Sequence, residues 1–147
     1  MTLTSWQNNI ISNNPQAVKE LLAKSKTIAV IAMTDATYKP SYYVPKYMLD
    51  QGYEIIPINP KLKQIEGIDC FTSLSQISKP IDIVQVFRRA EDVLPHAQEA
   101  LEIKPRAFWL QTGIINLAAA KLLAQKSILV VMDRCMYVDH KSFFAKA

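Results

Sequence analysis

Hydroxyl and basic side chains gather in a segment that follows an apolar run near the start of the chain. Thr34 and Ser41 flank a loop that also carries Lys39, and a helical pattern follows this loop. Free backbone N–H groups at the start of a helix, together with the helix dipole, attract anions such as phosphate. These residues predict a phosphate-binding loop over 34–41. A capped loop with a solvated lysine is the simpler alternative.

A second polar group follows the next apolar run. Asn59, Pro60 and Lys61 come directly after Ile58. An Asp or Glu at such a position would bind the ribose hydroxyls of NAD. An amide and a cation there disfavour NAD and favour a ribose that carries a phosphate. A rigid turn stiffened by proline is the alternative.

An aromatic ring and a guanidinium end the third apolar run. Phe87 could stack on a ligand ring, and Arg88 could bind a phosphate through two parallel hydrogen bonds. Pairing of an arginine with the nearby Glu91 or Asp92 is the alternative.

The last two apolar runs are followed by further candidates. Gln111 and Gly113 follow the fourth run, where a glycine permits close approach of the backbone to a ligand. Cys135 follows the fifth run and could act as a nucleophile with His140 as its base. Their spacing does not establish such a geometry, and it fails the common zinc patterns. We therefore expect structural roles for both.

The elements that position these residues follow from periodicity and from capping residues. Continuous apolar runs predict strands over residues 27–33, 53–58, 81–87, 107–110 and 127–132. Helices are predicted over residues 14–24, 41–51, 91–102 and 116–125, with at most a short helix at 74–77. Asn14, Ser41 and Asn116 are the expected N-caps. Pro45 is expected in or near the first turn of its helix.

Strands that alternate with helices predict an α/β fold. We expect a Rossmann-like three-layer sandwich with a five-stranded, mostly parallel sheet of order 3-2-1-4-5. One domain is expected over residues 1–147, with an N-terminal helical extension over 1–25. Such sheets bind ligands at the carboxyl ends of the strands, where the strand order reverses. In the expected order this point lies between the first and fourth strands.

Composition excludes several classes of protein. The 17 basic and 13 acidic residues give a net charge of +4 without a basic stripe, so nucleic-acid binding is not predicted. The longest apolar run, residues 28–33, is far shorter than the roughly 18–20 residues that a membrane helix needs. With 3 glycines, the chain has neither a glycine-rich dinucleotide fingerprint nor a Walker loop. The 2 cysteines fit free thiols in a reducing cytoplasm.

Five short motifs at the predicted strand ends together resemble a known family. The chain resembles the small bacterial CoA-binding proteins, which are relatives of the CoA-binding domain in the succinyl-CoA synthetase alpha subunit. The resemblance covers roughly residues 26–140. The motifs are Lys39-Pro40-Ser41-Tyr42, Ile56-Pro57-Ile58-Asn59-Pro60, Val86-Phe87-Arg88-Arg89, Gln111-Thr112-Gly113 and Met132-Asp133-Arg134-Cys135.

The resemblance implies that the ligand is CoA. Thr34 would contact its pyrophosphate, and Lys61 would reach the 3′-phosphate. The predicted CoA-binding residues, Ser41 of the phosphate loop included, are Thr34, Lys39, Ser41, Asn59, Pro60, Lys61, Phe87, Arg88, Gln111 and Gly113. Asn59 and Pro60 would line the nucleotide.

The resemblance also assigns positions around the ligand. Phe87 and Arg88 would flank the adenine or the phosphates, and Gln111 and Gly113 would form the wall under the pantetheine arm.

Two departures from the family pattern bear on affinity. Ala32 stands where the family usually has glycine, and Lys39 stands where it usually has arginine. A methyl group at position 32 would push the pyrophosphate outward, and a lysine cannot form a bidentate contact. Both changes are expected to weaken CoA binding.

We therefore expect a cytoplasmic protein that binds CoA or an acyl-CoA without catalysis, as a carrier, sensor or regulatory module. Related synthetases need a nucleotide-grasping domain and a phosphorylated histidine from a second domain, for which 147 residues leave no room. One alternative is a NAD-type nucleotide binder. Another is a thiol-redox module in which Cys135, activated by Arg134, forms a mixed disulfide with CoA. No metal site is expected, and a homodimer or a protein partner stays open.

Overall fold

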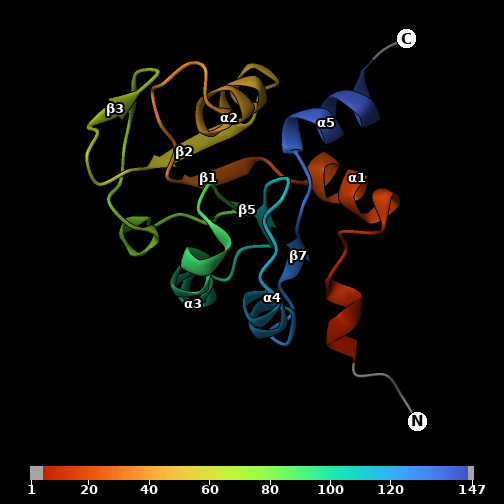
Figure 1. Ribbon diagram of the computed structural model, residues 1–147. Coiled ribbons are helices and arrows are strands. Elements are labelled where there is room, and N and C mark those ends of the chain that lie inside the picture. The colour runs from red at the N-terminus through yellow and green to blue at the C-terminus, as the bar shows by residue number, and fades with distance from the viewer. Residues whose placement is uncertain (1–4, 146–147) are drawn as a thin grey trace.

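A central parallel sheet with helices on both faces forms the frame of the molecule (Figure 1). The computed structural model describes residues 5–145, so residues 1–4 of the predicted N-terminal extension lie outside it. In spatial order the strands are β2 (Glu54–Ile58), β1 (Thr27–Ile31), β5 (Ile83–Val86), β6 (Ala107–Leu110) and β7 (Leu129–Val131). All neighbouring strands in this sheet are parallel. The α/β class and the Rossmann-like sandwich are confirmed.

The predicted strand order is wrong in one respect. Counted along the chain within this sheet, the order is 2-1-3-4-5, because β5 lies between β1 and β6 rather than outside β2. The Asp82 carboxylate explains this position, because it accepts hydrogen bonds from the backbone N–H groups of Lys26 (2.7 Å) and Thr27 (3.2 Å). These contacts fix the start of β5 beside the start of β1. The reversal of strand order therefore lies between β1 and β5.

The connection from β2 to β5 contains a small hairpin that the sequence patterns did not predict. Its two antiparallel strands are β3 (Gln64–Ile65) and β4 (Ile68–Asp69), and the short helix η2 (Leu74–Gln76) follows. Only η2 was expected.

Each face of the sheet carries its own apolar cluster. Successive strand residues point to opposite faces, so Ile28 and Val30 belong to one cluster and Ala29 and Ile31 to the other. The first face is covered by α1 (Pro15–Lys24), α2 (Pro40–Asp50) and α5 (Met136–Phe144). The second face is covered by α3 (Val93–Ile103), α4 (Leu117–Ala124) and η2. Gln85 shares its side of β5 with Ile83, so it faces α2 and α5.

Two of the three predicted helix caps are confirmed. The side chain of Asn14 accepts a hydrogen bond from the Ala17 N–H (3.1 Å) at the start of α1. Asn116 accepts one from the Ala119 N–H (2.9 Å) at the start of α4. These contacts satisfy N–H groups that have no partner within the helix.

The predicted cap at Ser41 is wrong. Helix α2 begins at Pro40 and its N-cap is Lys39, which makes no side-chain capping bond. Pro45 consequently lies inside the helix, near its first turn. Because proline has no N–H, it leaves the Ser41 carbonyl without its usual donor. That carbonyl instead accepts a hydrogen bond from the Thr34 N–H (3.3 Å), which holds the loop against the helix.

The N-terminal segment is attached to the far edge of the sheet. It contains the short helix η1 (Ser5–Asn9), and the Ile11 N–H donates to the carbonyl of Val130 in β7 (2.9 Å). The Asn9 side chain donates to the Ala124 carbonyl (2.9 Å). No helix between residues 5 and 145 is long and apolar enough to cross a membrane.

Candidate functional site

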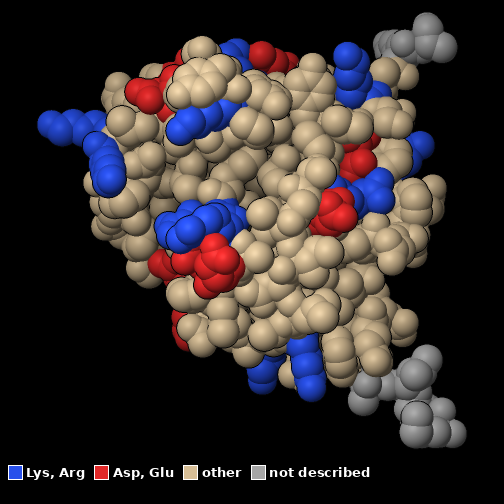
Figure 2. Space-filling view, viewed as in Figure 1, with Lys and Arg blue, Asp and Glu red and all other residues tan. Residues whose placement is uncertain are grey.

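The carboxyl ends of β5, β6 and β7 meet the start of α2 at a pocket of about 510 Å³ (Figure 2). Figure 2 shows a hollow on this face of the molecule with Lys and Arg side chains above and below it. The lining residues are Lys39, Pro40, Ser41, Tyr43, Val44, Phe87, Arg88, Arg89, Gln111, Thr112, Ile114 and Cys135. This position is the one where parallel α/β sheets commonly bind ligands.

The pocket brings together half of the predicted site residues. Lys39, Ser41, Phe87, Arg88 and Gln111 all line it. They come from segments far apart in the sequence, which only the sheet topology brings together.

Two further predicted residues lie beside residues of the lining. Thr34 shares a side-chain hydrogen bond with Ser41 (2.9 Å), so the two predicted hydroxyls are adjacent. Gly113 lies between two lining residues, and its N–H donates to the Asp133 carboxylate (2.6 Å). Gly113 has a positive φ of 83°, a conformation that glycine adopts without strain.

The Asn59 motif does not line the pocket. The Asn59 side chain donates to the Met33 carbonyl (2.9 Å) and accepts from the N–H groups of Lys61 (2.8 Å) and Leu62 (3.2 Å). The amide oxygen thus holds the turn, as the rigid-turn alternative supposes, and the amide nitrogen ties the turn to the segment after β1. Pro60 and Lys61 are exposed outside the pocket lining.

The two arginines at the pocket mouth have acidic neighbours. Asp92 accepts a hydrogen bond from Arg89 (3.2 Å) and lies 3.5 Å from the Arg88 guanidinium. Burial alone would raise the pKa of Asp92, but the hydrogen bonds and charges of Arg89 and Arg88 lower it below its ordinary value. Arg88 and Arg89 are largely exposed, so these are surface ion pairs of small energy that an incoming phosphate can replace.

Lys39 has no such acidic partner. It forms no ion pair within residues 5–145, and its ammonium lies 5.9 Å from the centre of the Tyr38 ring. A single cation at the start of an α-helix combines a full charge with the helix dipole. Lys39 is therefore the basic group of the pocket that is most open to an anion.

Arg134 and Cys135 have separate roles. The Arg134 guanidinium donates to both carboxylate oxygens of Asp139 (2.7 and 2.9 Å) and to the Ser12 carbonyl (2.9 Å). The hydrogen bonds to Asp139 raise the pKa of Arg134, and the bond to Ser12 attaches the N-terminal segment to the start of α5. All three guanidinium nitrogens donate in these contacts, which give no support to the expected activation of Cys135 by Arg134. Cys135 is half-buried and lines the pocket.

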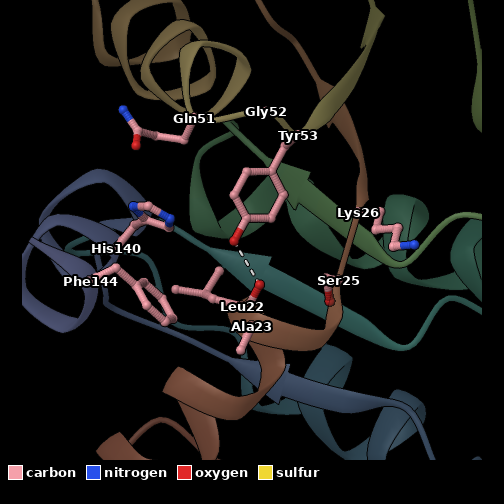
Figure 3. Close-up of a pocket in the computed structure, with 9 residues that line it drawn as sticks. All are labelled: Leu22, Ala23, Ser25, Lys26, Gln51, Gly52, Tyr53, His140 and Phe144. Atoms are coloured by element: carbon pink, nitrogen blue, oxygen red, sulfur yellow. Dashed lines mark hydrogen bonds between the residues drawn. The ribbon is translucent and has the colours of Figure 1, made fainter.

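His140 lies in a second pocket of about 310 Å³, away from Cys135 (Figure 3). This pocket is at the amino ends of β1 and β2, between the last turn of α1, the end of α2 and α5. His140 shares a hydrogen bond with the Tyr47 hydroxyl (3.0 Å), and the Tyr53 hydroxyl donates to the Leu22 carbonyl (2.6 Å). Burial lowers the pKa of His140. Cys135 and His140 therefore do not form a nucleophile–base pair.

Sequence reasoning missed several lining residues that come from α2 and from the loop after β6. Tyr43 and Val44 were assigned only to a helix, and Ile114 only to a turn. A helical pattern does not say which turn faces a ligand. The place of Tyr43 and Val44 depends on the start of α2 at Pro40, and the expected cap at Ser41 lies two residues after the observed cap at Lys39.

Comparisons with known proteins agree with this geometry. A protein-family model described as a CoA binding domain matches residues 26–141. The chain is 44% identical over 123 residues to the uncharacterized protein YneT of Bacillus subtilis (strain 168), covering 84% of this chain and 91% of YneT. The structure of cell-free ID.343 from Thermus thermophilus matches with a TM-score of 0.85 at 37% identity, covering 89% of this chain and 99% of that one.

A shorter match links the chain to a larger enzyme. Over 61 residues it is 33% identical to the ADP-forming acetate–CoA ligase of Methanocaldococcus jannaschii. The matched segment covers 42% of this chain and 9% of the ligase. The fold, the pocket at the carboxyl ends of the strands and the match over residues 26–141 lead to one conclusion: the chain belongs to the CoA binding domain family.

Proposed function

We propose that the protein binds CoA or an acyl-CoA in the pocket between α2 and the ends of β5, β6 and β7, without turning it over. The observation that carries this proposal is the distribution of charge and polarity in one pocket. Lys39, Arg88 and Arg89 lie on its lining, together with apolar side chains such as Val44 and Ile114. CoA has the matching composition, because it carries phosphates at one end and a long, uncharged pantetheine arm at the other.

The phosphate end is best matched by the start of α2. Lys39 supplies an unpaired positive charge, and Ser41 and Thr34 supply hydroxyl groups beside it. Arg88 adds a second cation from the opposite wall. Charge-assisted hydrogen bonds of this kind are roughly twice as strong as neutral ones.

A role in binding rather than catalysis is supported by the side chains around the pocket. Cys135 lines the pocket, but His140, the base considered for it, is hydrogen-bonded to Tyr47 and lines a different pocket. Among residues 5–145, no three His, Cys, Asp or Glu side chains are grouped so that they could hold a metal ion. We therefore infer a carrier, sensor or regulatory module.

The proposal is tested by isothermal titration calorimetry of the full chain with CoA, acetyl-CoA, dephospho-CoA, NAD and ATP. We expect saturable binding of CoA, weaker binding of dephospho-CoA, and no measurable preference for NAD. Acetyl-CoA incubated with the protein should release no free thiol above the rate without protein. Absence of CoA binding, or tighter binding of NAD, would show that the family likeness here describes the fold alone.

A second candidate function is favoured by the place of Cys135 in the same pocket. The Cys135 thiolate would attack a disulfide of CoA, form a mixed disulfide with one CoA and release the other as a thiolate. Intact-mass spectrometry after incubation with CoA disulfide would show an increase equal to one CoA, absent in Cys135→Ser. An unchanged mass in the wild type excludes this candidate and leaves reversible binding.

A further inference from the structure

The inner part of the pocket contains an amide whose environment fixes its orientation. Gln111 is 9% exposed and follows β6 directly. Its Oε1 atom accepts hydrogen bonds from the Gln85 side-chain nitrogen (3.1 Å) and from the Met136 backbone N–H (3.5 Å). One amide oxygen thus receives two donors from two different elements, β5 and α5.

This arrangement leaves the nitrogen of the Gln111 amide without a hydrogen-bond acceptor among residues 5–145. The reverse orientation would set the NH₂ group of Gln111 against the Met136 N–H, donor against donor. In the observed orientation, Gln111 Nε2 has no acceptor among residues 5–145, although the side chain is buried and lines the pocket. The pocket therefore presents two N–H groups without a protein partner.

Gln85 supplies a second, independent observation. It is fully buried in an inner strand, and its Oε1 is the one buried side-chain N or O atom within residues 5–145 that has no hydrogen-bond partner. Such an atom lowers stability, and an apolar side chain would fill the same space without this cost. The hydrogen bond from Gln85 to Gln111 gives Gln85 a role, because this bond holds the Gln111 amide in one orientation beneath the pocket.

The chemistry around Gln111 limits what its nitrogen can bind. Val44, Phe87 and Ile114 line the same pocket and are apolar, whereas the cations Lys39 and Arg88 line it at the start of α2 and the end of β5. An uncharged acceptor fits this surrounding better than a phosphate. In a ligand of the CoA class, the uncharged acceptors are carbonyl oxygens, those of the pantetheine amides and that of an acyl thioester.

We propose that Gln111 Nε2 donates a hydrogen bond to a carbonyl oxygen of the pantetheine–thioester arm, and that Gln85 is the positioning residue that orients it. This inference rests on the proposed binding of CoA. It adds a means by which the protein recognises the arm, and with a thioester carbonyl it would distinguish an acyl-CoA from CoA.

The test compares ligands that differ in their carbonyl groups, with dissociation constants from calorimetry. The ligands are acetyl-CoA, S-ethyl-CoA (a thioether of equal length without the thioester carbonyl), CoA, and adenosine 3′,5′-bisphosphate, which lacks the whole arm. The proteins are the wild type, Gln111→Met, Gln85→Met and the control Gln125→Met, an exposed residue at the end of α4.

We expect the wild type to bind acetyl-CoA about fivefold more tightly than S-ethyl-CoA, the effect of one neutral hydrogen bond. Gln111→Met should abolish this preference, Gln85→Met should reduce it, and Gln125→Met should keep it. None of the three changes should alter binding of the bisphosphate. Gln85→Met removes the unpartnered oxygen, so it should unfold at the wild-type temperature or above it, and its loss of preference could not be attributed to unfolding.

The remaining outcomes separate the two carbonyl sources and the two proposals. If the wild type binds acetyl-CoA and S-ethyl-CoA equally, but Gln111→Met weakens both and spares the bisphosphate, the carbonyl is a pantetheine amide. If Gln111→Met changes no affinity, the inference is wrong and CoA binding stands. If no CoA ligand binds the wild type, the proposed function fails, and this inference fails with it.

Discussion

The two pockets at opposite ends of the sheet differ in how their polar groups are satisfied. At the amino ends of β1 and β2, the Tyr53 hydroxyl and the His140 ring already bond to Leu22 and Tyr47. At the carboxyl ends, Lys39 has no acidic partner and the Gln111 nitrogen has no acceptor within residues 5–145. Helix α5 reaches both regions, since Cys135 precedes it and His140 lies within it. A hollow whose polar groups lack internal partners is the stronger candidate for binding, whatever its volume.

The largest effect is expected from the ion pair that fixes the start of this shared helix. Arg134→Met leaves the Asp139 carboxylate, which is 7% exposed, without its bidentate partner. Removing one member of such a pair should lower the free energy of unfolding by about 3 kcal/mol, or the melting temperature by roughly 10 °C. Differential scanning calorimetry measures this loss. The control Arg106→Met breaks only the exposed 4.0 Å contact with Asp82 and should cost less than about 1 kcal/mol. Equal losses in the two variants would show that the buried geometry adds nothing.

Exchanging one lysine in each pocket tests the comparison directly. Lys39→Gln removes the unpaired cation at the start of α2 and should weaken CoA binding about tenfold, the value of one charge-assisted hydrogen bond. Lys26→Gln removes a cation from the pocket at the amino ends and should leave the affinity unchanged. Calorimetry at two salt concentrations gives the dissociation constant for CoA and its change with salt. The dissociation constant should depend less on salt in Lys39→Gln only. Equal weakening by both substitutions would mean that net charge, and not this pocket, attracts the ligand.

Changes in the pocket at the amino ends should alter the pH dependence of the free energy of unfolding and leave the affinity for CoA unchanged. Burial lowers the pKa of His140, so the unfolded chain binds more protons than the folded one between the folded pKa and the ordinary value of 6.5. The contribution of the neutral His140 ring to the free energy of unfolding is therefore fully present above pH 6.5. It is lost as the pH falls from that value toward the folded pKa, with a slope below about 1.4 kcal/mol per pH unit for one proton. Urea unfolding at pH 5.5 and 7.5 measures the difference.

His140→Phe keeps a ring beside Tyr47 and Phe144 and should reduce this pH dependence, leaving the part due to His96. Burial also lowers the pKa of His96. The ratio of CoA affinities at the two pH values should be the same in His140→Phe and the wild type. A pH slope that is unchanged in His140→Phe would contradict the role of this histidine.

The elements of the sheet could be predicted because their signals are local. Apolar runs gave the five strands, and Asn14 and Asn116 marked the starts of their helices. The strand order could not be predicted this way, because it depends on contacts such as that of Asp82 with the start of β1. Helix α5 was missed because its sequence, MYVDHKSFF, contains few strong helix formers and has no side-chain cap. Its stability comes from packing and from the pair of Arg134 with Asp139.

The candidate site was predicted in part for the same reason. Residues directly after β5 and β6, such as Phe87 and Gln111, line the pocket because the carboxyl ends of parallel strands lie at one edge. Asn59 follows a strand end as well, but its amide oxygen accepts from its own loop and its nitrogen donates to Met33 after β1. The partner of Gln111 could not be foreseen, since Gln85 lies in the middle of an apolar run where a core role is the usual expectation.

The smallest effect concerns the backbone beside the pocket. Ala32 follows β1 with a positive φ of 64°, a conformation that costs a non-glycine residue roughly 1 kcal/mol or more. Ala32→Gly should therefore raise stability by up to about 1 kcal/mol, reduced by the greater freedom of glycine in the unfolded chain. Ser127 has the same φ of 64° before β7, at the other end of the sheet, so Ser127→Gly is the matched control. Both variants should melt a few degrees higher by calorimetry, roughly 2–4 °C per kcal/mol.

Only Ala32→Gly should also tighten CoA binding, because removal of the methyl group lets the pyrophosphate approach the backbone after β1 more closely. If both variants gain stability and neither gains affinity, the methyl group does not limit the ligand. The glycine that the family resemblance implies at this position would then serve the backbone conformation alone. If Ala32→Gly gains affinity without stability, the ligand rather than the strain accounts for the glycine. In either case, the comparison with Ser127 separates a requirement of the fold from a requirement of the pocket.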